Sequence, residues 1–172
     1  FSAAQYLLAD DTEFIQSLNM TGMNLDISYL LGKPAPERLV GTGWVRLAYN
    51  VSLGTGSTDL TRAYNFYAPW IERYAKAGLK VIIVLTHQTF GEGQGYVWPQ
   101  MTPEKWKEYT PRFADMVKKV VAQYAGKGWV TAYQIWNEQD TPPEAAGSAV
   151  PMPPASYAYL LSETIKAIKT VD

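Results

Sequence analysis

A glutamate follows a run of residues that is typical of a buried β-strand. Residues 130–136 are mainly apolar, β-branched or aromatic, and Asn137 and Glu138 come directly after them. The next segment is rich in proline and glycine, which indicates a loop. A carboxyl group at the end of a buried parallel strand can stay protonated near neutral pH and act as a proton donor. Glu138 is therefore the first candidate for a catalytic residue.

Polar side chains also occur at other predicted strand ends. Arg46 lies in one apolar run, and His87 ends another. Because the carboxyl ends of parallel strands meet on one face of a barrel, we expect these side chains to gather around Asn137 and Glu138. Arg46 suits the orientation of a carboxylate, and His87 and Asn137 suit hydrogen bonds to hydroxyl groups. For His87, a purely structural role in the core is the alternative.

Four further residues are candidates to line a binding cleft. Asp26 lies near the end of the first predicted strand, and Tyr49 and Asn50 lie near the end of the second. Trp98 lies in a glycine-rich loop and offers an indole face on which a sugar ring could stack. The alternative for Trp98 is a lid that packs on the protein. Glu92, in the same loop, is a possible second carboxylate or simply a solvated residue.

The candidate residues can lie on one face only if strands and helices alternate along the chain, and the sequence predicts this alternation. Apolar runs predict strands at residues 22–28, 44–51, 79–86 and 130–138. Capping residues and helical spacing predict three long helices: one capped by Thr58 or Asp59 and ending before Gly78, one capped by Thr102 and ending before Gly126, and one from Ser156 to about Lys169. Shorter helical segments are expected at residues 12–18 and 36–40.

The alternation predicts an α/β fold in which a strand–helix unit occurs four times. Such an order is typical of a parallel sheet with right-handed crossovers, so we expect a (β/α)4 half of a TIM-type barrel. Residues 1–20 form a lead-in segment, and residues 21–172 form one domain. A whole barrel typically needs about 250 residues, and this sequence ends where a fifth strand would be due.

Composition limits the classes of function. Lysine and arginine number 15 against 16 acidic residues, so charge gives no reason to expect a nucleic-acid or membrane partner. The chain has no cysteine and one histidine, which excludes thiolate or multi-histidine metal sites, and no cofactor is expected. No phosphate-binding glycine loop joins a strand to a helix. Six Trp and twelve Tyr residues would suit a sugar-binding cleft.

The arrangement of these motifs resembles that of clan A glycoside hydrolases. Three motifs account for the resemblance: Arg46 in Trp-Val-Arg-Leu, His87 after Val-Ile-Ile-Val-Leu-Thr, and Ile-Trp-Asn-Glu at residues 135–138. Trp-Asn-Glu is similar to family 39 and some family 5 members, although Gln139 stands where proline is usual. The resemblance implies a retaining (β/α)8-barrel glycosidase of secreted type. It also implies that Glu138 is the acid/base and that a β-linked oligo- or polysaccharide is the substrate.

The resemblance also implies that part of the active site lies elsewhere. In clan A the nucleophile is a glutamate at the end of the seventh strand, and only four strands are predicted here. A half-barrel has two open edges and one open apolar face. We therefore expect it to be completed by a homodimer or by further sequence. In a two-fold dimer the partner's third strand would take the seventh position and place a second His87 opposite Glu138, so such a dimer would be a poor catalyst.

Two other functions remain open on the sequence alone. One is a carbohydrate-binding or assembly module that binds sugar without hydrolysing it. The other is an inverting hydrolase in which Glu138 pairs with Glu92 or Asp140. Inversion requires a wider carboxyl separation of about 6.5–9.5 Å, against about 5–5.5 Å for retention. The stereochemistry of the product would distinguish the two mechanisms.

Overall fold

The chain folds around one parallel β-sheet. The computed structural model describes residues 20–28, 32–53, 57–90, 94–142, 144, 147 and 149–172. The strands are β1 (Gly22–Leu25), β2 (Trp44–Ala48), β3 (Lys80–Leu85) and β4 (Ala132–Ile135). They lie in the order β1-β2-β3-β4, and each neighbouring pair is parallel. The predicted α/β fold, a (β/α)4 half of a TIM-type barrel, is confirmed.

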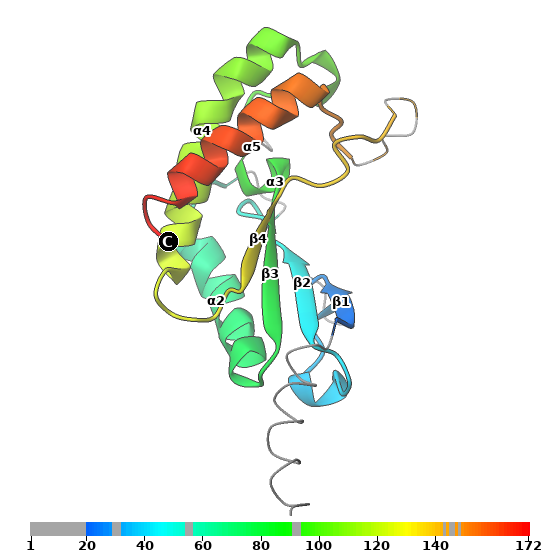
Figure 1. The fold of residues 1–172 in the computed structure, drawn as a ribbon, viewed down its shortest axis with the longest axis vertical. Helices are drawn as coiled ribbons and strands as arrows, with labels where there is room; N and C mark the ends of the chain where they lie inside the picture. Colours follow the sequence, from blue (N-terminus) through cyan, green and yellow to red (C-terminus); the bar gives the residue numbers. More distant parts are fainter. Residues whose placement is uncertain are drawn as a thin grey trace, which may run out of the picture.

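Helices separate the strands along the chain. The α-helices are α2 (Leu60–Lys76), α3 (His87–Phe90), α4 (Pro103–Tyr124) and α5 (Pro154–Ile168), and two 3-10 helices are η2 (Pro36–Arg38) and η3 (Trp98–Gln100). The long helices α2, α4 and α5 lie on the same side of the sheet, and α4 packs along α5 (Figure 1). None of the described helices is long and apolar enough to cross a membrane.

The two faces of the sheet differ in burial because side chains alternate along a strand. Leu47, Ile83 and Leu85 point toward the helices and are at most 1% exposed. The opposite face carries Arg46, Ile82 and Gln134, which are only half-buried. We call this second face the concave face, since it corresponds to the inside of a barrel. No described helix covers it (Figure 1).

The long helices begin at side-chain caps or prolines. The Asp59 carboxylate accepts hydrogen bonds from the backbone N–H groups of Thr61 and Arg62 at 2.9 and 3.2 Å. Thr102 caps α4, as predicted. Helix α5 differs from prediction, because it starts at Pro154 with Pro153 as its N-cap, and Ser156 lies inside the first turn. The fixed φ of proline suits the first position of a helix, so Pro154 starts α5 before Ser156 can cap it.

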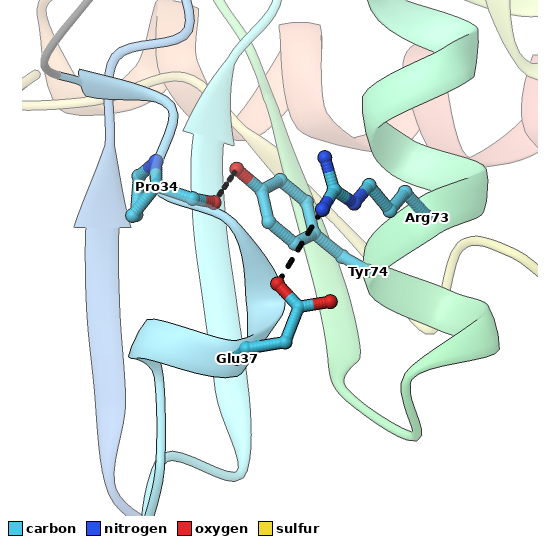
Figure 2. Close-up of polar contacts among 4 residues, drawn as sticks. All are labelled: Pro34, Glu37, Arg73 and Tyr74. Carbon is cyan, nitrogen blue, oxygen red and sulfur yellow. Dashed lines mark hydrogen bonds and ion pairs between the residues drawn. The ribbon is translucent and has the colours of Figure 1, made fainter.

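The segment between β1 and β2 is linked to α2 by a hydrogen bond and an ion pair near the amino ends of the strands. The Tyr74 hydroxyl donates a hydrogen bond of 3.0 Å to the Pro34 carbonyl, and Arg73 forms an ion pair of 3.4 Å with Glu37 (Figure 2). Tyr74 is fully buried, whereas both charged side chains are exposed, so the buried tyrosine makes the stronger link.

All four strands are shorter than predicted, and the ends of β1 and β4 have clear causes. β1 ends at Leu25 because the Asp26 carboxylate accepts a hydrogen bond from the backbone N–H of Ser28 and forms a turn. β4 ends at Ile135 because Trp136 has a φ of 70° and Glu138 a φ of 55°, which a strand cannot accommodate. The helical segment predicted at residues 12–18 lies outside the described residues.

The Asp59 cap gives a direct test of how α2 begins. Replacing Asp59 with alanine leaves two N–H groups of the first turn without their acceptor. We expect the free energy of unfolding to fall by about 1 kcal/mol, measured by urea denaturation. Asp115→Ala is the control, since its exposed ion pair with Lys119 should contribute much less. Equal losses in the two variants would contradict the capping role.

The uncovered concave face gives a second test. We expect the isolated chain to self-associate through this face, because apolar surface and open strand edges favour pairing. Light scattering coupled to size-exclusion chromatography should show species larger than a monomer, reduced by Ile82→Lys on the concave face. Ile165→Lys, on an exposed site of α5, should leave association unchanged. A wild-type chain that elutes as a monodisperse monomer and melts cooperatively would refute this expectation.

Candidate active site

Arg46 lies at the centre of a hydrogen-bond network on the concave face. Its Nε donates to Gln134 Oε1 at 2.8 Å, its Nη1 to Asn24 Oδ1 at 3.1 Å, and its Nη2 to Asn137 Oδ1 at 2.7 Å. These partners come from β1, from β4 and from the residues just after β4. Arg46 therefore connects three strands and fixes the position of the residue that precedes Glu138.

The acceptors of Arg46 are uncharged. All three are side-chain amide oxygens, and among the described residues no carboxylate pairs with the guanidinium. A half-buried cation whose partners in the described part of the chain are all neutral gives the concave face a positive potential. This potential would favour a carboxylate, or a developing negative charge, brought next to Arg46.

The segment from Trp136 to Glu138 has a strained backbone that neighbouring groups hold in place. Trp136 and Glu138 both have positive φ, which costs energy for residues with a side chain. The Trp136 N–H donates to the Leu85 carbonyl at 2.8 Å, and its indole Nε1 donates to the Val150 carbonyl at 3.0 Å. Gln134 Nε2 donates to the Trp136 carbonyl at 2.8 Å. Strain that is held in this way is common at functional sites.

The orientation of the Asn137 amide follows from its partners. Arg46 and the Gln134 amide nitrogen only donate, so Asn137 must present Oδ1 to both, at 2.7 and 3.3 Å. The Asn137 Nδ2 group then has no acceptor within the described part of the chain. It is a hydrogen-bond donor available to a bound molecule.

Glu138 is exposed at the carboxyl end of the sheet. Its backbone carbonyl accepts a hydrogen bond of 3.3 Å from the Thr141 N–H, which begins the loop toward α5. Its carboxylate forms no hydrogen bond or ion pair with any described residue. The carboxyl group is thus accessible to a ligand and next to the Arg46 network.

His87, at the start of α3, lies between two tryptophans. Its ring centroid is 5.5 Å from that of Trp98 and 5.8 Å from that of Trp136. Burial lowers the pKa of His87 to about 4, because desolvation disfavours the charged ring. His87 is therefore neutral at physiological pH and suited to hydrogen bonding rather than to charge pairing.

Trp98, in η3, belongs to an aromatic cluster beside His87. It lies nearly parallel to Tyr96, at 5.6 Å between centroids and 10° between planes, and to Trp106, at 6.2 Å and 16°. Trp98 and Trp106 both line a pocket between η3 and the loop that follows Glu138. The structure thus brings Trp98 close to His87 and to that loop.

Three of the predicted site residues make contacts outside the Arg46 network. The Tyr49 ring is 1% exposed and lies within the interface between sheet and helices, where it stacks on Tyr67 with ring centroids 4.4 Å apart. Asn50 caps a turn, as its Oδ1 accepts from Ser52 Oγ at 2.8 Å and from the Leu53 N–H at 3.0 Å. Asp26 bonds to Ser28 in the turn after β1. The geometry therefore gives these residues structural contacts.

Sequence reasoning missed Gln134 and Asn24, which are both partners of Arg46. Asn24 lies opposite Arg46 in the β1–β2 register, and Gln134 lies two residues before Trp136. A polar side chain that is partly buried within a strand requires a partner, and that signal could have identified Gln134. Asn24 is exposed on β1, so the sequence carried no such signal for it. Glu92 lies outside the described residues. No group of three metal-binding side chains lies together in the described part of the chain.

Comparisons with known proteins support the fold. No family model matches the chain, and no curated protein matches its sequence. A solved structure described as that of a glycoside hydrolase aligns with 88% of this chain at a TM-score of 0.58 and 14% identity. The aligned region covers 49% of that protein, so the chain spans about half of its length. The likeness shows that this chain has the fold of half of such a protein.

The neutral state of His87 can be tested by titration. As the chain contains one histidine, its imidazole signals can be assigned without ambiguity in an NMR spectrum. We expect a midpoint near pH 4 in the folded protein, against about 6.5 for an unperturbed histidine. Because the pKa is lower in the folded state, protonation favours unfolding, and stability falls as the pH drops from about 6.5 toward 4. A folded-state midpoint near 6.5 would show that the ring is solvated.

Proposed function

We propose that this chain carries the acid/base side of a retaining β-glycoside hydrolase active site of the clan A type. Glu138 is the general acid and base, and Arg46, Asn137 and His87 surround the sugar at the carboxyl end of the sheet. The observation that supports this most is the hydrogen bond of 2.7 Å between Arg46 and Asn137. It joins the arginine and the Asn-Glu pair, two motifs that lie 91 residues apart in the sequence.

The proposed reaction has two steps. A second carboxylate attacks the anomeric carbon while Glu138 donates its proton to the glycosidic oxygen, so the carbon–oxygen bond breaks and the aglycone leaves as an alcohol. In the second step, water attacks the anomeric carbon of the covalent intermediate while Glu138 takes a proton from that water. The bond to the second carboxylate breaks, and the sugar is released with its original configuration. The second carboxylate comes from strands beyond the four described here, in a further half of the barrel.

The charge on Arg46 is consistent with a second carboxylate that comes from the other half of the barrel. Its guanidinium has only neutral acceptors among the described residues, and a carboxylate placed over the concave face would provide the missing counter-ion. The free Nδ2 group of Asn137 would donate to a sugar hydroxyl. Neutral His87 would bind another hydroxyl, with Trp98 and Trp136 limiting the position of its ring.

Hydrolysis of a panel of aryl β-glycosides, with Glu138→Gln beside the wild type, tests the role of Glu138. Where the wild type turns over, we expect kcat/KM to fall by about 10²–10⁴-fold with substrates whose leaving groups need protonation, and much less with a dinitrophenyl leaving group, because kcat/KM reports the first step alone. Glu144→Gln is the matched control, because Glu144 is an exposed glutamate in the same loop. Measurable hydrolysis that is equal in Glu138→Gln and the wild type would reject the assignment.

A binding measurement covers the case in which the isolated chain does not turn over. A β-linked oligosaccharide, which is neutral, should shift the NMR signals of the Asn137 side-chain amide and the His87 ring by hydrogen bonding to them. Arg46→Met should abolish these shifts by releasing Asn137. A chain that neither hydrolyses the panel nor responds to any β-linked oligosaccharide would overturn the proposed function.

A further inference from the structure

A second feature lies beside Glu138, outside the Arg46 network. It is a pocket of about 640 Å³ between η3, the start of α4 and the two ends of the loop that joins β4 to α5. Its lining includes Trp98, Met101, Trp106, Gln139, Met152 and Tyr157. We call it the leaving-group pocket, for reasons that follow from its position and chemistry.

The pocket begins at the residue that follows the proposed acid/base. Gln139, the residue after Glu138, forms part of its wall, and the Gln139 carbonyl accepts a hydrogen bond of 2.9 Å from the Met152 N–H. That bond draws the segment before α5 against the segment that follows Glu138. A general acid must contact the oxygen that joins sugar and leaving group. We therefore place the sugar over Arg46 and Asn137 and the leaving group toward this pocket, whose wall begins one residue after Glu138.

The lining is mostly apolar. Besides two tryptophans, two methionines and one tyrosine, it contains several prolines, and its polar side chains come from the three consecutive residues 139–141. Sugar hydroxyls would find few hydrogen-bond partners on such a surface, whereas an aryl or alkyl group would bury apolar area there. Methionine side chains adapt to irregular apolar shapes, which favours such a ligand further.

The pocket is held open by contacts within the protein. The Tyr157 hydroxyl donates to the Ile135 carbonyl at 3.2 Å, and the Trp136 indole donates to the Val150 carbonyl at 3.0 Å. These bonds attach the segment before α5, and α5 itself, to the end of β4. Trp98 lies near Trp106 on the opposite wall, with planes 16° apart. A pocket formed before binding loses little entropy when it takes up a ligand.

We propose that the leaving-group pocket binds an apolar aglycone, an aryl or alkyl alcohol, so that the glycosides of this site are those of hydrophobic alcohols. This proposal rests on the proposed function, because it names the substrate class of the same site. It adds a binding site whose residues are separate from Glu138, Arg46, Asn137 and His87. Trp98 also contacts one of these four, His87. The aglycone would enter with its glycosidic oxygen next to Glu138 and its apolar part against Met101, Trp106 and Met152.

Binding of 4-methylumbelliferone, a fluorescent aryl alcohol, tests the pocket without any turnover. We expect saturable binding to the full chain and a loss of about tenfold or more in affinity for Thr141→Arg, whose long side chain would fill the pocket. Thr170→Arg makes the same change beyond the end of α5 and should bind like the wild type. Trp98→Phe should weaken binding less than Thr141→Arg, because phenylalanine keeps an aromatic surface at this position.

The outcomes separate this proposal from the function on which it rests. If 4-methylumbelliferone binds equally to the wild type and Thr141→Arg, or does not bind, the aglycone pocket is rejected and the assignment of Glu138 is unaffected. If a β-linked oligosaccharide, and not the aryl alcohol, loses affinity in Thr141→Arg, the pocket takes sugar and the proposal is also rejected. If binding behaves as expected but Glu138→Gln retains full hydrolysis, the pocket stands and the proposed catalytic role fails.

Discussion

The guanidinium of Arg46 is the constraint on which the candidate site depends. A cation on an uncovered sheet face must satisfy its donors, and here it does so with amide oxygens from β1, β4 and the residues after β4. Those bonds fix the strand ends relative to one another and set the direction of the Asn137 amide. Removing the cation would leave the oxygens of Gln134 and Asn137 without this donor and would release the strained segment before Glu138.

Local strain and distant packing are coupled through Trp136. Its backbone has a conformation that bulky residues avoid, yet its indole is 1% exposed and bonded to the segment before α5. The cost of the backbone is offset by burial of a large ring and by hydrogen bonds at both ends of the residue. One side chain thus links the end of β4, the aromatic cluster around Trp98 and the wall of the neighbouring pocket.

Much of this arrangement follows from the sequence, and the exceptions have physical reasons. Amphipathic spacing and capping residues predict α2 and α4, and the meeting of parallel strand ends predicts that Arg46 and Asn137 lie together. Tyr49 is buried because it shares the alternation of Leu47 rather than of Arg46, and therefore points toward the helices. The positive φ of Trp136 could not be predicted, since tertiary contacts and not local preference maintain it.

Tyr49, Tyr67 and Tyr124 form a cluster of rings between the sheet and the helices, and this cluster limits the stability of the fold at high pH. Desolvation raises the pKa of Tyr49 and Tyr124, and it raises that of Tyr67 to about 12. A phenol whose pKa is higher in the folded state contributes stability below its unfolded pKa of about 10, and this contribution is lost as the pH rises further. The interface between sheet and helices is therefore sensitive to alkali. Phenolate absorbance from these rings would appear only as the two layers separate, which makes the cluster an intrinsic optical reporter of that event.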